Sequence, residues 1–102
     1  MPGPDRLAAP FLLAAILALS ACDSAKERAE DHYQRASALL EEGDTARAIV
    51  EFRNVFRLDG NHSAARRDYA NLMVEEGRLE EAIGQFLRLV EQDWSNVDGH
   101  KR

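Results

Sequence analysis

From about residue 26 onward, the apolar side chains recur every three or four positions, which gathers them on one face of an α-helix. This spacing predicts one helix over residues 26–42 and another over residues 46–58. Gly43 separates them, because a glycine just past the last periodic residue can adopt a left-handed conformation that ends a helix. Asp44 can then cap the following helix by accepting a hydrogen bond from a free backbone amide. The pattern therefore predicts a helical hairpin.

The same pattern occurs twice, in residues 29–62 and 63–96, with a period of 34 positions. The identical pairs are Ala36/Ala70, Glu41/Glu75, Glu42/Glu76, Gly43/Gly77, Ala48/Ala82, Ile49/Ile83, Phe52/Phe86 and Asp59/Asp93. Further pairs are apolar on both sides, so the repeat follows the positions expected to be buried. A fixed period of this length is typical of stacked helical arrays. We therefore predict an all-α fold, an α-α superhelix of two helical hairpins.

Small residues mark the places where two helices should approach closely. Ala36 and Ala48 have one-carbon side chains, as do their counterparts in the second copy, and Phe52 or Phe86 should fill the space beyond them. We expect these alanines and phenylalanines to form the core.

The repeat resembles the tetratricopeptide repeat (TPR) family, whose 34-residue unit is a pair of antiparallel helices. The family's small and large apolar places hold Ala36, Leu39, Gly43, Ala48 and Phe52 in the first copy, and Ala70, Met73, Gly77, Ala82 and Phe86 in the second. This resemblance covers residues 29–96, two thirds of the chain. The sequence departs from the family pattern at His32 and Arg66, where a bulky apolar residue is usual, and at Gly60 and Trp94, which occupy the usual proline place.

The resemblance implies a protein-binding surface on the concave face, lined by the first helix of each unit. The residues that would line this surface are Tyr33, Ser37, Leu40, Arg67, Asn71 and Val74. Arginine and asparagine can hold a carboxylate or an extended backbone, while tyrosine supplies contact area. Three interpretations remain open: a clamp for C-terminal carboxylates, a less specific groove for a protein or peptide client, and a plain solvated surface.

The first 21 residues have the pattern of a signal peptide. An unbroken apolar run of nine residues, 11–19, is too short to span a membrane and is followed by the small residues Ser20 and Ala21. The quartet that ends in Cys22 resembles the bacterial lipobox, in which the cysteine receives a diacylglyceryl group and a peptidase cuts just before it. The alternatives are an ordinary secretory leader and an N-terminal helix with a chance cysteine.

The lipobox resemblance implies a lipoprotein in the bacterial cell envelope. Cys22 would carry the acyl chains, such as palmitate, and residues 22–28 would tether the repeats to a membrane on its periplasmic side. Asp23 resembles a signal for retention in the inner membrane, but the choice between inner and outer membrane stays open. The net charge of −5 argues against nucleic acid as a partner, since phosphate binding needs clustered Lys and Arg.

Residues suited to catalysis or to metal binding are not grouped in this sequence. His32, His62 and His100 lie far apart, without cysteines or carboxylates at metal-ligand spacing, and we predict that they are solvated surface residues. The sequence offers no nucleophile motif and no phosphate-binding loop. We expect no enzyme activity, no metal and no cofactor other than the lipid on Cys22.

Beyond the second copy, residues 95–98 look like the cap and opening of a third unit, truncated within residues 97–102. Ile83, Leu87 and Val90 would then lack the helix that should cover them. Two interpretations follow: the chain is a truncated product of a longer repeat protein, or it completes itself on a partner or on a second copy.

Together, these patterns predict a membrane-anchored TPR lipoprotein that acts as a protein-protein interaction adaptor in cell-envelope assembly or polymer secretion. The alternatives are a structural module that self-associates through the uncovered end of the second repeat, and a non-functional fragment without a client.

Overall fold

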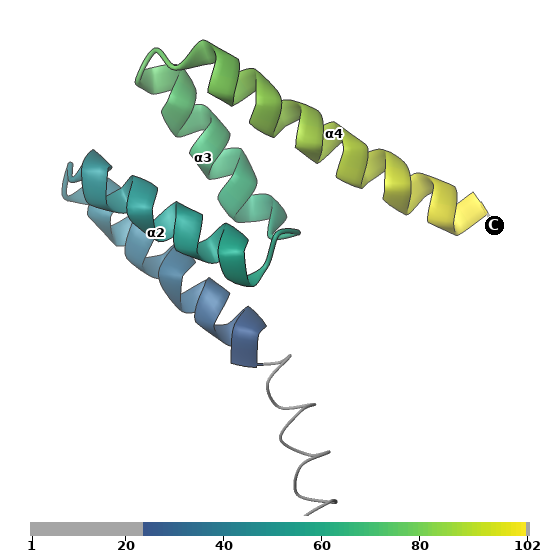
Figure 1. The fold of residues 1–102 in the computed structure, drawn as a ribbon, viewed down its shortest axis with the longest axis horizontal. Helices are drawn as coiled ribbons and strands as arrows, with labels where there is room; N and C mark the ends of the chain where they lie inside the picture. Colours follow the sequence, from purple (N-terminus) through teal and green to yellow (C-terminus); the bar gives the residue numbers. More distant parts are fainter. Residues whose placement is uncertain (1–23, 102) are drawn as a thin grey trace, which may run out of the picture.

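The computed structural model describes residues 24–101, with side chains through residue 95. This part of the chain forms helices joined by short turns and contains no strand (Figure 1). The first helix covers residues 24–41 and is followed by α2 (Thr45–Leu58), α3 (Ser63–Glu75) and α4 (Leu79–Lys101). The predicted all-α fold is confirmed over these residues, whereas the predicted signal peptide and Cys22 lie outside them. No helix in the described region is both long and apolar enough to cross a membrane.

Both hairpins turn in the same way, at Gly43 and Gly77, whose φ angles are +80° and +76°. In the first turn the amide of Asp44 donates to the carbonyl of Leu39 at 2.8 Å, and the second turn repeats this bond 34 residues later. Glycine is favoured here because a side chain destabilises a positive φ. The carboxylate of Asp44 then accepts from the amide of Arg47 at 3.2 Å, which confirms the predicted cap of α2.

The core consists mainly of alanines around a few large side chains. Its buried members are Ala29, Ala36, Ala48, Phe52, Val55, Ala65, Tyr69, Ala70, Leu72, Met73 and Ala82. All four predicted alanines are therefore buried, and Phe52 is 0% exposed. The corresponding prediction for Phe86 is wrong, because this side chain is 37% exposed. The difference arises because α3 packs against α2, whereas no described helix packs against the outer face of α4.

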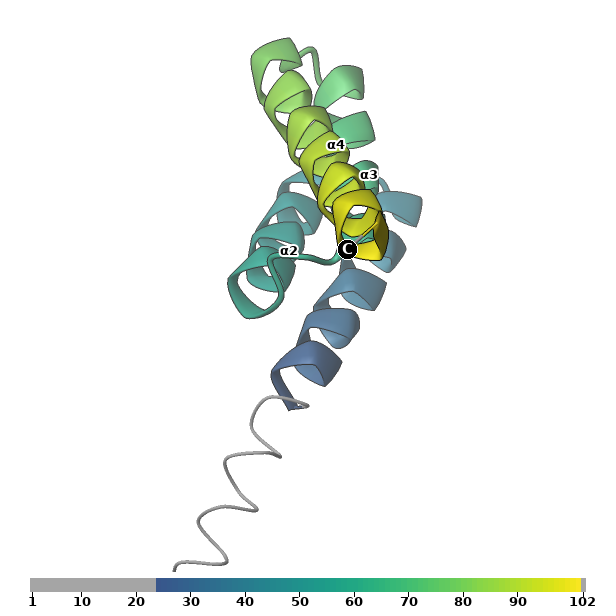
Figure 2. The same ribbon diagram turned by 90° about the vertical axis from the view of Figure 1, so that its right-hand side faces the viewer.

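The two hairpins are stacked through α3, which packs along α4 on one side and against α2 on the other (Figures 1 and 2). The ring of Tyr69 on α3 lies 5.6 Å from that of Phe52 and 5.7 Å from that of Phe56, measured between ring centroids. These aromatic contacts join the second hairpin to α2 of the first.

The C-terminal helix is longer than predicted. Instead of a cap and a new helix at residues 95–98, α4 continues through these positions to Lys101. The reason lies at the family's proline place, where Trp94 keeps the backbone amide that a helix needs. At the equivalent place of the first repeat, Gly60 sits in the turn after α2 and favours the break.

Candidate functional site

The predicted binding residues lie on two neighbouring helices. Tyr33, Ser37 and Leu40 are on the first helix, where all three are partly buried. The other three are exposed on one face of α3, and we call them the α3 row: Arg67, Asn71 and Val74. The helices are joined by a hydrogen bond of 2.5 Å from the Tyr33 hydroxyl to Oδ2 of Asp68, next to the α3 row.

Tyr33 is held by contacts within the protein. Its ring lies 4.8 Å from the ring of His62 and 6.5 Å from that of Phe52, between centroids, and its hydroxyl is bonded to Asp68. Leu40 packs against the core. Among the six predicted binding residues, the exposed polar side chains are therefore Arg67 and Asn71 of the α3 row. Sequence reasoning missed Asp68, since a contact across 35 positions between two repeats leaves no periodic signal.

The Tyr33 hydroxyl resists ionisation. Its hydrogen bond to Asp68, and then its burial and the charge of Asp68, raise the pKa of Tyr33 to about 12 from 10.0. The pKa of Tyr69 is also raised, first by burial and then by its hydrogen bond to Glu81. Because folding favours the neutral phenols, their stabilisation is fully present below the unfolded pKa of about 10 and is lost as the pH rises through the folded values.

We therefore expect the folded protein to keep both of its tyrosines neutral at a pH near 10, where about half are ionised in the guanidinium-unfolded chain. The measurement is an absorbance titration of tyrosinate. Asp68→Asn removes the acceptor carboxylate and should return the Tyr33 midpoint towards its ordinary value. Asp31→Asn, at an exposed position, should leave it unchanged. Equal tyrosine midpoints in the folded and unfolded protein would contradict the Tyr33–Asp68 bond.

His32 and Arg66, at which the sequence departs from the family pattern, form equivalent polar contacts in the two hairpins. Nδ1 of His32 lies 2.7 Å from Oε2 of Glu51, and Nη1 of Arg66 donates to Oε1 of Gln85. Both members of the second pair lie 34 positions after those of the first. Each pair links the two helices of its own hairpin, so the period itself could have identified these contacts from the sequence.

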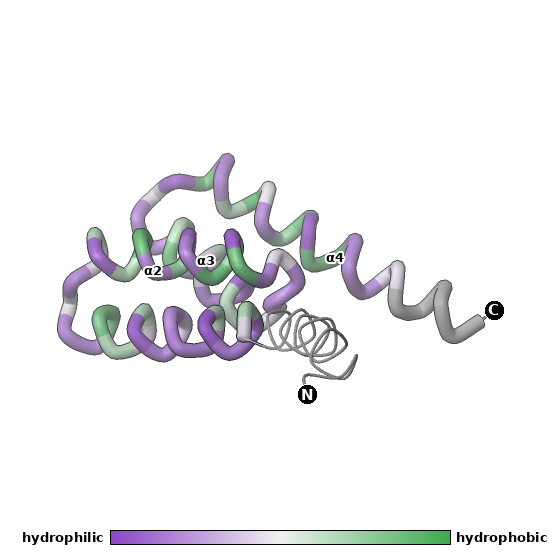
Figure 3. The backbone as a smooth tube through the Cα atoms, turned by 60° about the horizontal axis from the view of Figure 1, so that its bottom comes forward, coloured by the Kyte–Doolittle hydropathy of each residue, from purple (hydrophilic) through white to green (hydrophobic). Residues whose placement is uncertain are grey.

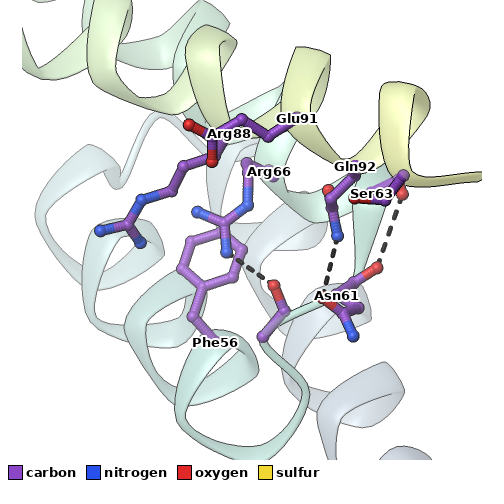
Figure 4. A pocket seen from close by; sticks show the side chains of 9 residues that line it. Phe56, Asn61, Ser63, Arg66, Arg88, Glu91 and Gln92 are labelled. Carbon is purple, nitrogen blue, oxygen red and sulfur yellow. Dashed lines mark hydrogen bonds between the residues drawn. The ribbon is translucent and has the colours of Figure 1, made fainter. Parts of the chain in front are cut away.

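Arg66 holds the junction between the hairpins and is only 4% exposed. Its guanidinium lies 4.5 Å from the centre of the Phe56 ring, and its Nη2 donates to the carbonyl of Gly60 at 2.7 Å (Figure 4). Burial, and secondarily the charge of Arg88, lower the pKa of Arg66. Both arginines line a polar pocket of about 710 Å³ between α4 and the turn after α2. Because its Nη groups are bonded within the protein, Arg66 has a structural role here.

His62 joins the start of the first helix to the start of α3. Its Nδ1 accepts from the amide of Ala65 at 3.1 Å, which caps α3, and its Nε2 lies 2.8 Å from Oε2 of Glu30. The bond to His62 is the main reason why the pKa of Glu30 is lowered. The prediction that His32 and His62 are simply solvated is therefore wrong, while the side chain of His100 lies outside the described region.

Within the described residues, no three side chains of His, Cys, Asp or Glu are grouped as a metal site. The geometry around the α3 row suits binding. An arginine and an asparagine one turn apart can donate hydrogen bonds to a carboxylate or a peptide backbone, and Val74 adds apolar area one turn further on.

Comparison with protein families supports this interpretation. The tetratricopeptide repeat family matches residues 39–96, more than half of the chain. Comparisons with curated proteins and with solved structures found no match. Repeats of this family typically serve as protein-binding modules without catalytic activity. The family match and the two stacked helical hairpins lead to one conclusion: the chain belongs to the tetratricopeptide repeat family.

Proposed function

We propose that this chain is a bacterial lipoprotein, anchored to a membrane by acyl chains on Cys22 and facing the periplasm. It binds a protein or peptide client there and acts as an adaptor in cell-envelope assembly or polymer secretion. The observation that carries the binding role is the exposed α3 row in a protein of the TPR family, whose members generally bind protein partners.

The chemistry of the α3 row favours a client with a carboxylate or an extended segment. Arg67 and Asn71 lie one helical turn apart and are exposed, so both can bind the same backbone or carboxylate group. Val74 is 47% exposed and continues the row with an apolar contact. Tyr33 and Asp68 support the row by fixing the first helix beside α3.

The membrane anchor is supported by the sequence alone. The apolar run of residues 11–19, the small residues after it and Cys22 occur in the order that bacterial lipidation requires. With several acyl chains on one residue, each buried methylene contributes about 0.8 kcal/mol, so the anchor would be stable.

The binding role is tested by affinity capture of the membrane-bound protein and mass spectrometry of what is captured with it. Arg67→Glu combined with Asn71→Ala should reduce the recovered client at least tenfold, since a buried arginine contact commonly contributes more than about 1.4 kcal/mol. Both side chains are exposed, so the variant should fold normally. Tyr33 is unsuitable for this test, because its substitution would also loosen the contact between the hairpins.

Arg57→Glu is the matched control, since it reverses an exposed charge on α2, away from the α3 row. It should capture the same client in the same amount as the wild type. Recovery of the same proteins from the wild type and from the Arg67/Asn71 variant would contradict recognition by the α3 row.

A further inference from the structure

The outer face of α4 carries a continuous apolar stripe. Its members recur at helical spacing and are all exposed: Leu79, Ile83, Phe86, Leu87, Val90 and Trp94. Ile83 and Trp94 are 59% and 63% exposed, and hydrophobic segments recur along α4 in Figure 3. We call this surface the α4 stripe. A run of large apolar side chains in water is typical of an interaction surface.

At the opposite end of the stack, the first hairpin has an apolar groove between its two helices. The groove has a volume of about 420 Å³. Its lining residues are Arg35, Ala38, Leu39, Glu42, Arg47, Val50 and Glu51. Val50 is 53% exposed. We call this surface the N-terminal groove.

Within the molecule, two surfaces equivalent to the α4 stripe and the N-terminal groove are already in contact, at the junction between α2 and α3. On α2, Phe52 and Phe56 correspond by the 34-residue period to Phe86 and Val90 of the α4 stripe, and both contact Tyr69 of the second hairpin. Tyr69 corresponds to Arg35 in the N-terminal groove. The apolar face of α2 that carries Phe52 and Phe56 thus packs against the second hairpin, and Phe52 is 0% exposed, whereas Phe86 is 37% exposed.

The N-terminal groove has side chains that can pack against the apolar α4 stripe. Ala38 and Leu39 stand where the second hairpin has the buried Leu72 and Met73, so the floor of the groove remains apolar. The same equivalence brings Arg35 against Phe86. An arginine over an aromatic ring is a favourable contact, and Arg66 over Phe56 is an example within this chain.

We infer that the occupant of the α4 stripe is a second copy of this chain, which receives the stripe in its N-terminal groove. The contact repeats the α2–α3 junction between molecules. It joins two different surfaces, so it is head-to-tail, and further copies can be added at both ends. The α3 row takes no part in it and remains available to a client.

The test uses the full chain in whole cells that express two differently tagged copies, one with Val90→Cys and the other with Arg35→Cys. A short thiol-reactive cross-linker should join these two copies, because the equivalent rings of Phe56 and Tyr69 lie 5.7 Å apart. Arg57→Cys in place of Arg35→Cys is the matched control, and the wild type shows any background from Cys22. Adding Ile83→Glu to the Val90→Cys copy should reduce the cross-link at least tenfold.

A cross-link between positions 35 and 90 that exceeds both controls and is lost with Ile83→Glu supports the head-to-tail contact. No excess over the controls would overturn it. A stronger cross-link between two Val90→Cys copies would also overturn it, because the stripes would then face each other. Capture of a client through the α3 row uses neither the α4 stripe nor the N-terminal groove. A negative cross-linking result would therefore leave the proposed function unaffected.

Discussion

Replacement of Phe52 by alanine is expected to lower the free energy of unfolding by about 3–5 kcal/mol, the range for removing a fully buried aromatic ring. Phe52 is 0% exposed, and its ring neighbours include Tyr33 of the first helix and Tyr69 of α3. A domain of this size has a total stability of only roughly 4–12 kcal/mol. The substitution should therefore remove at least about a quarter of the total free energy of unfolding.

Phe86→Ala is the matched control, because Phe86 occupies the same repeat position on α4 and is partly exposed. Its cost should be at most about two thirds of that for Phe52→Ala, because part of the Phe86 ring is already in water and less buried apolar surface is lost. Denaturant unfolding followed by circular dichroism gives both values, at a protein concentration low enough to keep copies apart. Equal costs at the two positions would show that Phe52 does not hold the hairpins together.

Cys22→Ser is expected to move the protein from almost entirely membrane-bound to almost entirely soluble. Serine has no thiol, so the thioether to diacylglycerol cannot form, and the described helices contain no segment able to span a membrane in its place. Loss of two or three acyl chains removes many buried methylenes, each of which contributes about 0.8 kcal/mol. The change should therefore be nearly all-or-none.

Membrane fractionation of a bacterial host measures this change, together with labelling by a fatty acid. Ser20→Ala is the control, since it keeps a small residue before the cysteine and should leave the protein lipidated and membrane-bound. Continued membrane association of Cys22→Ser would contradict lipid anchoring and favour an uncleaved N-terminal helix.

The helical pattern could be predicted because it depends on local spacing. Gly43 and Gly77 end their helices because each turn needs a residue in the left-handed conformation. Ala36 and Ala48 recur at the repeat period as Ala70 and Ala82, and all four are buried. These features specified the hairpins and most of the core. The predicted break at residues 95–98 was wrong, because a polar segment with no proline or glycine at its start can continue a helix as easily as end one.

The contacts of the polar residues were harder to predict. The family resemblance places Tyr33 on a client-binding face, but its hydroxyl bonds to Asp68 on the next hairpin, and no local pattern contains that pairing. The sequence predicts a solvated His62, yet this residue caps α3 and contacts Glu30, 32 positions earlier. Such contacts depend on the orientation of one hairpin relative to the next. The spacing of residues along the sequence does not determine that orientation.

Recognition of a protein client by the α3 row of this repeat protein can be measured by a binding titration with the purified, captured client. The wild type and Arg57→Glu should bind saturably with the same affinity. Arg67→Glu should bind at least about tenfold more weakly, which corresponds to 1.4 kcal/mol. Equal affinity of all three proteins for the client would contradict recognition by the α3 row.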